Sequence, residues 1–471
     1  MTKSYDVAII GSGSAGLSAL REVRKQTDNF VLINDGFYGT TCARVGCMPS
    51  KTLIEAAIAF HRCKALGSFG MSGAERLVVD IPAVLRRVRR LRDSFVAGML
   101  KLTDEMKDHS IAGRARFLEP QVLAVGERRV HAKKIIIATG SRPVVPKEWA
   151  ALGTRMLTSD DLFEQETLPS RMAVIGMGAL GSEIAQALAR LGIEVTGFGS
   201  DEHIAGLSDP DVNRQAVALL RAEFAIHLGQ AAEPVIEGER IRVHAGNESA
   251  VADKVLVALG RRPNVDQMGI ENLGVELDEH GVPPFDARSM QIAGLPVYIA
   301  GDASRHLPLL HEALDEGYIA GYNAPRNEPV CFERRVPLAI VFTDPGIAVV
   351  GQSFKTLNED EIVIGEVDFS NQGRARMAEV NHGLLRVYAE RSSDRLLGAE
   401  MCAPQGEHLA HLLALAVQRK LTVRELLGMP FYHPVLEEGL RTALRDAAGK
   451  LGGAAVPDLG YCDRLGADAI D

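Results

Sequence analysis

The pattern Gly-x-Gly-x-x-Gly occurs twice in this chain of 471 residues, each time directly after a short apolar segment. Residues 5–10 lead into Gly11-Ser12-Gly13-Ser14-Ala15-Gly16, and residues 172–175 lead into Gly176-Met177-Gly178-Ala179-Leu180-Gly181. Glycines at this spacing allow a tight turn between a strand and a helix, and the free N–H groups at the helix start bind a pyrophosphate. One such pattern is weak evidence, but two in their expected setting predict two dinucleotide-binding units.

Each unit is expected to close with a further apolar strand. Residues 134–138 lead into Thr139-Gly140-Ser141-Arg142-Pro143, and residues 255–259 lead into Gly260-Arg261-Arg262-Pro263. The likeness of these two segments indicates an internal repeat. A third apolar segment, residues 297–300, ends at Gly301-Asp302. An aspartate after a glycine is usually an exposed turn residue, but this one follows a buried strand, which suits a hydrogen bond to a bound cofactor better.

The second strand of each unit should end with an acidic residue that binds the ribose hydroxyls of the nucleotide. In the first unit the candidates at this place are Asn34 and Asp35, after a strand expected at residues 30–33. In the second unit Gly199 takes the place of the acid, after a strand expected at residues 194–198. Acids follow nearby, and residues 199–203 include no arginine of the kind that an NADP site uses, so the sequence favours NAD over NADP.

We call the two Gly-x-Gly-x-x-Gly patterns the first and the second fingerprint. Two cysteines, Cys42 and Cys47, lie between the first fingerprint and its closing strand. Pro49 is expected to begin a helix to Phe60 whose dipole places positive potential near Cys47, and Lys51 adds a positive charge. Both effects favour a thiolate, which indicates a redox-active disulfide. The pair alone is equally compatible with buried cysteines or a structural bridge. In a reducing compartment a disulfide is more often catalytic, and this favours the redox interpretation.

Composition narrows the class of protein. With 46 glycines, 46% hydrophobic and 24% charged residues, the chain is typical of a turn-rich α/β protein of several domains. The net charge of −9 argues against a nucleic-acid or anionic membrane partner, and no apolar run reaches the roughly 20 residues of a membrane helix. A strand is expected almost at the start, which leaves no room for a targeting peptide and predicts a cytoplasmic protein. No metal site is expected, because His61 and Cys63 have no second ligand pair at zinc-like spacing.

After about residue 336 the pattern changes to short strands with separate helices, which predicts an α+β domain. Strands are expected at residues 338–342, 362–367, 384–388 and 396–401, and helices at 407–418 and 434–448. His433 and Pro434 introduce the last helix. A histidine at such a place is most often an exposed cap, but Glu437 and Glu438 follow, and a carboxylate that orients an imidazole is what a general base needs.

Together these motifs resemble, over nearly the whole chain, those of the disulfide-reducing flavoproteins known as class I pyridine nucleotide-disulfide oxidoreductases. The most specific match is Gly39-Thr40-Thr41-Cys42-Ala43-Arg44-Val45-Gly46-Cys47-Met48-Pro49-Ser50-Lys51. The resemblance implies a glutathione reductase-like fold of two Rossmann-like α/β domains and a C-terminal α+β dimerisation domain. The implied boundaries are 1–145 and 265–335 for the FAD-binding domain, 146–264 for the NAD(P)-binding domain and 336–471 for the interface domain.

The resemblance also implies roles for the residues of the redox centre. Cys47 would contact the flavin, and Cys42 would exchange with the substrate. Lys51 would lie near the flavin N5, paired with Glu183. Asp302 would bind the ribityl chain of FAD.

The base and the remaining cofactor contacts are likewise implied by the resemblance. The family forms obligate homodimers, so each active site would use the partner subunit's His433, oriented by Glu438. The other expected FAD contacts are Gly11, Gly13, Ser14, Ala15, Gly16, Asn34, Asp35, Thr41, Ala115, Thr139, Gly140, Leu310 and His311. The expected contacts of the nicotinamide nucleotide are Gly176, Gly178, Gly181, Gly199 and Gly260.

Within the family, the motifs are most similar to those of the dihydrolipoamide dehydrogenases, which oxidise dihydrolipoamide or a lipoyl domain with NAD. Two departures lie in the interface domain. Asp344 stands where these enzymes commonly have histidine, and Phe431-Tyr432 replaces the His-Ala that often precedes the catalytic His-Pro.

Three alternatives stay open at this point. The first is an NADPH-dependent reductase of another small disulfide. The second is a mercuric reductase-like enzyme, although the tail carries only Cys462 where that class has vicinal cysteines. The third is a redox-sensing or scaffolding flavoprotein. The basic run Arg86 to Arg90 is expected to be a solvated helix face, with a docking surface for an acidic partner as its alternative.

Overall fold

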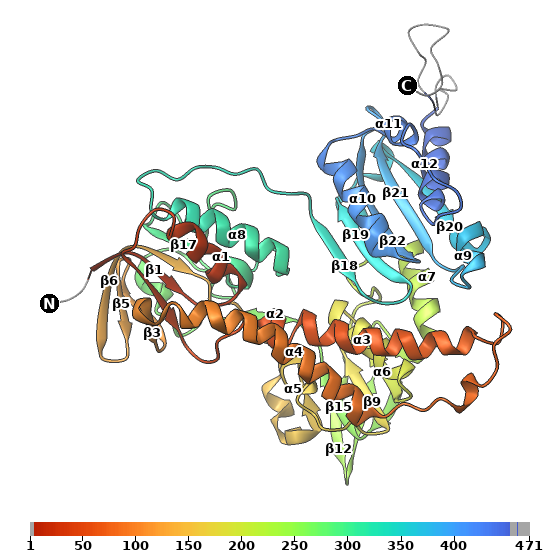
Figure 1. The fold of residues 1–471 in the computed structure, drawn as a ribbon, viewed down its shortest axis with the longest axis horizontal. Helices are drawn as coiled ribbons and strands as arrows, with labels where there is room; N and C mark the ends of the chain where they lie inside the picture. Colours follow the sequence, from red (N-terminus) through yellow and green to blue (C-terminus); the bar gives the residue numbers. More distant parts are fainter. Residues whose placement is uncertain (1–3, 453–458, 460–471) are drawn as a thin grey trace, which may run out of the picture. The chain divides into compact units, whose positions relative to one another are not determined.

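The computed structural model describes residues 4–452 and residue 459, and it divides into two compact units (Figure 1). The first unit contains the described residues up to 56, together with 78–169 and 254–334. The second unit contains residues 57–77, 170–253 and the described residues from 335 onwards. The predicted boundaries of three domains remain a prediction.

A sheet with a parallel centre forms the core of the first unit. Its strand order is β3-β2-β1-β6-β5-β4, and β17 pairs with β6. Strands β1, β2, β3, β6 and β17 run parallel, whereas β4 and β5 form an antiparallel extension. The bounds are β1 (Ser4–Ile10), β2 (Phe30–Asn34), β3 (Ser110–Ala112), β4 (Ala115–Glu119), β5 (Val122–Val125), β6 (Arg128–Ile137) and β17 (Val297–Ile299).

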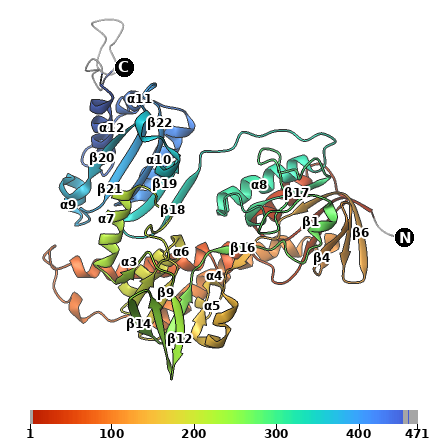
Figure 2. The ribbon, with the colours of Figure 1, turned by 180° about the vertical axis from the view of Figure 1, so that it is seen from behind.

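Both faces of this sheet are buried, because alternate side chains of each strand enter different apolar clusters. Val7 and Ile9 pack in one cluster with α1 (Ser14–Val23) and α8 (Leu310–Asn323). Ala8 and Ile10 pack in the other, beside β4 and β5. The two helices lie side by side in both views (Figures 1 and 2).

The other elements of the first unit lie between the two fingerprints or after the second one. The helices are α2 (Thr41–Arg44), α3 (Cys47–Arg62), α4 (Ile81–Asp104) and α5 (Ser159–Leu162), of which α3 continues into the second unit. The strands are β7 (Ser141–Pro143), β8 (Met156–Leu157), β15 (Lys254–Val257) and β16 (Arg261–Pro263). Strands β7 and β16, which carry the repeated sequence, pair antiparallel with one another.

The second unit contains the second fingerprint. Strands β9 (Arg171–Ile175), β10 (Glu194–Phe198) and β11 (Ala225–His227) run parallel, with α6 (Ala179–Arg190) after β9 and α7 (Pro210–Arg221) after β10. An antiparallel sheet of β12 (Glu233–Glu237), β13 (Arg240–Ala245) and β14 (Glu248–Ala252) follows.

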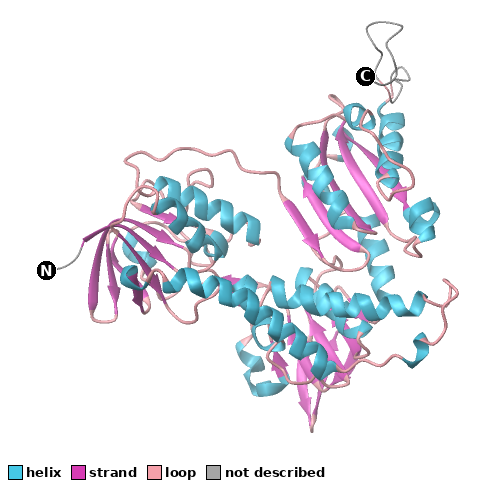
Figure 3. Cartoon of the chain, viewed as in Figure 1, coloured by secondary structure: helices cyan, strands magenta, loops and turns pink. Residues whose placement is uncertain are grey.

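An antiparallel sheet with helices makes up the C-terminal part of the second unit (Figure 3). Its strand order is β18-β19-β22-β21-β20. The strands are β18 (Leu338–Val341), β19 (Gly346–Gly351), β20 (Ile362–Asp368), β21 (Leu384–Glu390) and β22 (Leu396–Ala403). The helices are α9 (Gly373–Met377), α10 (Gly406–Gln418), α11 (Val423–Leu427) and α12 (Glu438–Leu451). The predicted α+β character of this segment is confirmed.

Two local expectations for this segment were wrong. The expected strands omitted β19, whose apolar run is bounded by glycines; a Cβ on Gly351 would lie 2.4 Å from the carbonyl oxygen of Leu397, so only glycine fits there. The last helix begins at Glu438 and not at Pro434. The N–H of Val435 binds the Glu438 carboxylate at 3.2 Å, which holds residues 433–437 in turns ahead of the helix.

Buried carboxylates join α7 to the C-terminal sheet within the second unit. Asp209, the N-cap of α7, is fully buried and accepts a hydrogen bond from the Tyr388 hydroxyl at 2.9 Å and from Arg386 at 3.2 Å. Glu400 of β22 is also fully buried and accepts from the N–H groups of Ser208 and Asp209. Buried carboxylates are stable only when they are bonded in this way.

We expect Gly317→Ala in α8 to lower the thermal unfolding midpoint of the purified protein. A Cβ at this position would lie 2.2 Å from the carbonyl oxygen of Ala15 in α1, and such overpacking typically costs about 1–3 kcal/mol. Gly98→Ala is the matched control, because Gly98 lies inside α4 and has no neighbouring atom within 4 Å of its built Cβ. This control should raise the stability by about 0.5–1 kcal/mol. Equal midpoints for the two variants would contradict the close α1–α8 packing.

Candidate active site

The first fingerprint forms a tight turn between β1 and α1. Gly11 has a φ of +106°, and a Cβ there would lie 2.2 Å from the carbonyl oxygen of Ala138. A Cβ on Gly16 would lie 1.9 Å from the carbonyl oxygen of Gly11. Gly13 differs, because no described atom lies within 4 Å of its built Cβ, and it starts α1 without a side-chain cap. The N–H groups at Ser14 and Ala15 therefore begin a helix beside open space, as a pyrophosphate site requires.

Asn34, one of the two residues expected to bind ribose, contacts the fingerprint turn. The amide oxygen of Asn34 accepts hydrogen bonds from the Ser12 N–H at 3.2 Å and the Ser12 hydroxyl at 2.8 Å, while its amide nitrogen donates to Gly36. Asp35 is exposed and lies 4.0 Å from the guanidinium of Arg114. The hydrogen bonds from Ser12 to Asn34 were not predicted from the sequence.

Three segments of the first compact unit, which contain Ser141, Arg261 and Asp302, meet at Asp302. The hydroxyl of Ser141 donates to Asp302 Oδ2 at 2.5 Å, and Arg261 Nε donates to the same hydroxyl at 2.8 Å. Glu316 of α8 accepts from the Gly301 N–H at 2.8 Å and from Ser304, so it fixes the turn that carries Asp302. Burial raises the pKa of Glu316 against the opposing effect of Arg334.

The remaining residues expected at this site also lie in the first unit. Thr139 has a buried hydroxyl oxygen with no hydrogen-bond partner among the described residues, and a Cβ on the adjacent Gly140 would meet open space. Leu310 and His311 start α8, and His311 lies 3.7 Å from a carboxylate oxygen of Glu312. Ala115 is buried in β4.

These residues fit a bound FAD. An unpartnered buried hydroxyl at Thr139, open space at Gly13 and Gly140, and the uncapped start of α1 are all features that a dinucleotide would complete. Among the described residues, no atom lies within 4 Å of a Cβ built on Gly13 or Gly140.

The two cysteines flank a break between two helices. Thr41 and Cys42 lie in the single turn α2, which Thr40 caps by accepting from the Ala43 N–H at 3.1 Å. Cys47 is exposed and is the first residue of α3, two residues before the predicted start. A hydrogen bond to Cys47, with burial, raises the pKa of Cys42 far above its ordinary range.

This arrangement favours negative charge on Cys47. A helix start stabilises an anion, and Lys51 lies four residues further along the same helix.

The second fingerprint repeats the geometry of the first. Gly176 has a φ of +104°, and α6 starts after Gly178, which has no described atom within 4 Å of its built Cβ. Gly181 is buried in α6, and Gly260 is open with a φ of +89°. A Cβ on Gly199 would lie 2.8 Å from a methyl group of Leu228, so a side chain there requires Leu228 to move.

Two sets of polar residues lie in the second unit. His433 Nδ1 lies 3.0 Å and 3.1 Å from the carboxylate oxygens of Glu438, and the imidazole is exposed. The hydrogen bond to His433 lowers the pKa of Glu438. Glu183 is buried in α6 and accepts from the Phe342 N–H at 2.8 Å. Glu438, the residue that the spacing predicts as partner of His433, is thus the carboxylate in contact with its imidazole.

Three further expectations from the sequence concern metal ligands, the basic run Arg86 to Arg90 and membrane helices. Within the described ranges no group of three potential metal ligands occurs, and Cys462 lies outside them. In the basic run, Arg87 donates to the carbonyl of Thr52 and Arg89 to that of Gln165, so part of the run serves packing. No described helix combines the length and apolarity that crossing a membrane demands.

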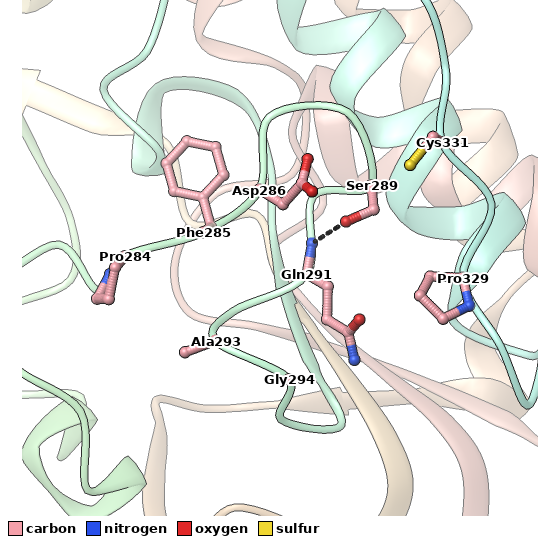
Figure 4. Close-up of a pocket in the computed structure, with 9 residues that line it drawn as sticks. All are labelled: Pro284, Phe285, Asp286, Ser289, Gln291, Ala293, Gly294, Pro329 and Cys331. Atoms are coloured by element: carbon pink, nitrogen blue, oxygen red, sulfur yellow. Dashed lines mark hydrogen bonds between the residues drawn. The ribbon is translucent and has the colours of Figure 1, made fainter.

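A pocket of about 520 Å³ in the first unit lies between residues 284–294 and residues 329–331 (Figure 4). It contains the exposed thiol of Cys331 and the carboxylate of Asp286. None of the residues predicted for the site lines it.

Comparison with known proteins identifies the family of the chain. Residues 5–317 match the pyridine nucleotide-disulphide oxidoreductase family, and residues 337–444 match its dimerisation domain. A dihydrolipoyl dehydrogenase of Thermus scotoductus is 33% identical, covering 94% of this chain and 97% of that protein. A mercuric reductase of Shigella flexneri is 32% identical, covering 93% of this chain and 80% of that protein.

A solved structure supports the fold. The Cu(II) complex of the HOCl-induced flavoprotein disulfide reductase RclA from Escherichia coli matches with a TM-score of 0.82 at 23% identity, covering 94% of this chain and 99% of that one. The expected glutathione reductase-like fold class is confirmed by this match and the two domain matches. Since both matched domains come from one family and together span most of the sequence, the chain belongs to the pyridine nucleotide-disulphide oxidoreductases, which use FAD and NAD(P).

Proposed function

We propose that this protein is a dihydrolipoamide dehydrogenase, which oxidises dihydrolipoamide, free or on a lipoyl domain, with NAD. The observation that carries the proposal is the Cys42–Cys47 pair, in which the Cys42 thiol is hydrogen-bonded to a sulfur at the start of α3. The pair lies in the same unit as the residues that fit FAD. The homologues named dihydrolipoyl dehydrogenase support this choice of substrate.

The cysteines, in their oxidised disulfide form, would take two electrons from the substrate. The partner subunit's His433 accepts the proton of one substrate thiol, and Glu438 holds the imidazole in place. The substrate thiolate attacks the sulfur of Cys42, which breaks the bond to Cys47 and releases it as a thiolate. The second substrate thiol then closes the substrate disulfide and leaves Cys42 as a thiol.

The cofactors supply the rest of the reaction. Bound FAD would accept the two electrons held by the cysteines and pass them as a hydride to NAD. For this chain we assign the flavin site to Lys51 with Glu183, Asp302, Thr139 and the first fingerprint, and the NAD site to the second fingerprint. The protein's own share is to position these groups, to stabilise the thiolate and to exclude water.

A second candidate is an NADPH-dependent reductase of another small disulfide or of a metal ion. Its support is the exposed Tyr432 beside His433, in place of the small residue common in dihydrolipoamide dehydrogenases, and the missing ribose acid at Gly199. The mercuric reductase homologue adds to it.

Steady-state rates separate the two candidates. We expect the purified protein to oxidise dihydrolipoamide with NAD faster than it reduces any of a panel of disulfides, or Hg²⁺, with NADPH. His433→Gln should lower the dithiol oxidation about 10²- to 10⁴-fold, the usual effect of a lost general base, and retain FAD. Preference for NADPH and another acceptor would refute the proposed substrate.

The role of Cys47 predicts a spectroscopic result. Reduction of the wild-type protein with one equivalent of dithiol should produce a long-wavelength absorption band from a Cys47 thiolate beside the flavin, and Cys47→Ser should abolish it. Cys63→Ser is the control, because Cys63 directly follows α3 and its thiol donates to the carbonyl of Ala59 at 3.4 Å. Cys42→Ser should show the band without any reductant. A normal band in Cys47→Ser would contradict the assignment.

The His433–Glu438 pair predicts a pH-dependent stability. The pKa of Glu438 lies below its ordinary value of 4.5 in the folded state, so its contribution is fully present above pH 4.5 and is lost as the pH falls through the lower folded value. Unfolding midpoints of wild type and Glu438→Gln should therefore differ at neutral pH and converge in acid. Glu437→Gln, the neighbouring control, should follow the wild type throughout. A difference that persists in acid would disprove the linkage.

A further inference from the structure

Hydrogen bonds join one face of α6 to residues 342–344. We call this set of contacts, from Glu183, Gln186 and Arg190 to Phe342 and Asp344, the ladder. Glu183 accepts from the Phe342 N–H at 2.8 Å. Gln186 accepts from the Asp344 N–H at 2.9 Å and donates to the Asp344 carbonyl at 2.8 Å. Arg190 donates to the Asp344 carboxylate at 2.8 Å and to its carbonyl at 2.7 Å. The three helix residues are spaced so that they share one face of α6.

All three helix side chains are buried, with exposed fractions of 3%, 3% and 5%. Arg190 is therefore a buried cation, and it is stable because Glu223 and Asp344 flank it. Burial opposes its charge, but the hydrogen bonds and charges of these two carboxylates outweigh that effect and raise its pKa. A buried ion pair is weak evidence for stability but fixes the groups it joins in one arrangement.

Asp344 supplies the carboxylate of the segment 342–344 to the ladder. It lies two residues after Phe342, whose N–H binds Glu183. Its hydrogen bonds with Arg190 and Gln186 therefore hold the backbone next to the donor of Glu183.

We propose that Asp344, held by Arg190 and Gln186, is a positioning residue for Glu183. The proposal rests on the role given above to Glu183, which acts on the flavin through Lys51. Glu183 itself has a buried carboxylate whose direction depends on the backbone of Phe342. Asp344 thus couples the C-terminal domain to the chemistry at the flavin without contacting substrate or cofactor.

Glu223 offers a matched control. It also binds Arg190, at 2.7 Å and 2.8 Å, and it accepts from the Gln186 amide at 2.7 Å. A glutamine in its place keeps an acceptor for Gln186 and removes only the charge beside Arg190. The Glu223 side chain is 19% exposed against 32% for Asp344. Glu223→Gln and Asp344→Asn each remove one carboxylate from the same guanidinium. Only Asp344 belongs to the segment that binds Glu183.

The experiment compares four variants of the FAD-loaded protein: Glu183→Gln as the reference, Asp344→Asn, Gln186→Leu and Glu223→Gln. The readouts are the flavin midpoint potential, the long-wavelength thiolate band and the rate constant of flavin reduction by dithiol. We expect Asp344→Asn and Gln186→Leu to shift the first two in the same direction as Glu183→Gln and to slow reduction roughly 10-fold, as a misplaced group does. Glu223→Gln should match the wild type.

The outcomes distinguish a failure of the proposed role of Glu183 from a failure of the inference about Asp344. If Glu183→Gln leaves potential and band unchanged, the role of Glu183 is wrong and the inference falls with it. If Glu183→Gln changes them while Asp344→Asn and Gln186→Leu do not, the inference alone is overturned. Equal changes in Glu223→Gln and Asp344→Asn would show general loosening around Arg190 and also overturn it. If Asp344→Asn does not fold, Gln186→Leu decides, because it leaves no new unpaired charge.

Discussion

The first unit depends on the close contact of α1 with α8. Glycines make this contact possible, since a Cβ on Gly317 would lie 2.2 Å from the carbonyl oxygen of Ala15, and one on Gly321 would lie 2.4 Å from that of Ala19. The residue before Gly317 is Glu316, which binds the Gly301 N–H. One packing contact therefore sets the position of the fingerprint helix and of the turn that carries Asp302. Both halves of the predicted flavin site follow from it.

What could be predicted from the sequence was the chemistry that depends on neighbouring residues. The two fingerprints, the start of α3 near Cys47 and the pairing of His433 with Glu438 all involve residues within a few positions of each other. The support of these groups could not be predicted, because it joins distant residues: Ser141 and Asp302 are 161 positions apart, and Arg261 and Ser141 are 120 apart. Asn34 shows the same limit. Its position predicts ribose binding, which stays a prediction, but nothing in the sequence indicated that its amide oxygen accepts from Ser12.

Long-range polar contacts also explain why the second unit contains both the second fingerprint and the C-terminal sheet. Sequence patterns placed these segments in separate domains, since the change from helix-and-strand alternation to segregated strands marks a boundary. Asp209 and Glu400 are fully buried carboxylates, and each needs donors from the other segment. The ladder from α6 to Asp344 adds a second such connection. Apolar periodicity carries no information about these carboxylates, because they lie in otherwise ordinary strands and caps.

The division of labour between the cysteines follows from local structure and is independent of the substrate. The Cys42 pKa is raised by its hydrogen bond to Cys47, whereas Cys47 begins a helix of 16 residues. In the proposed exchange Cys47 is the better leaving group, because a helix start stabilises its thiolate, so the proposal has the substrate attack Cys42 and Cys47 depart. Any dithiol that reaches Cys42 meets this same bias. If the proposed mechanism holds, discrimination among substrates falls to residues near the proposed base, and Tyr432, which is 80% exposed and adjacent to His433 in the sequence, is a candidate for that role.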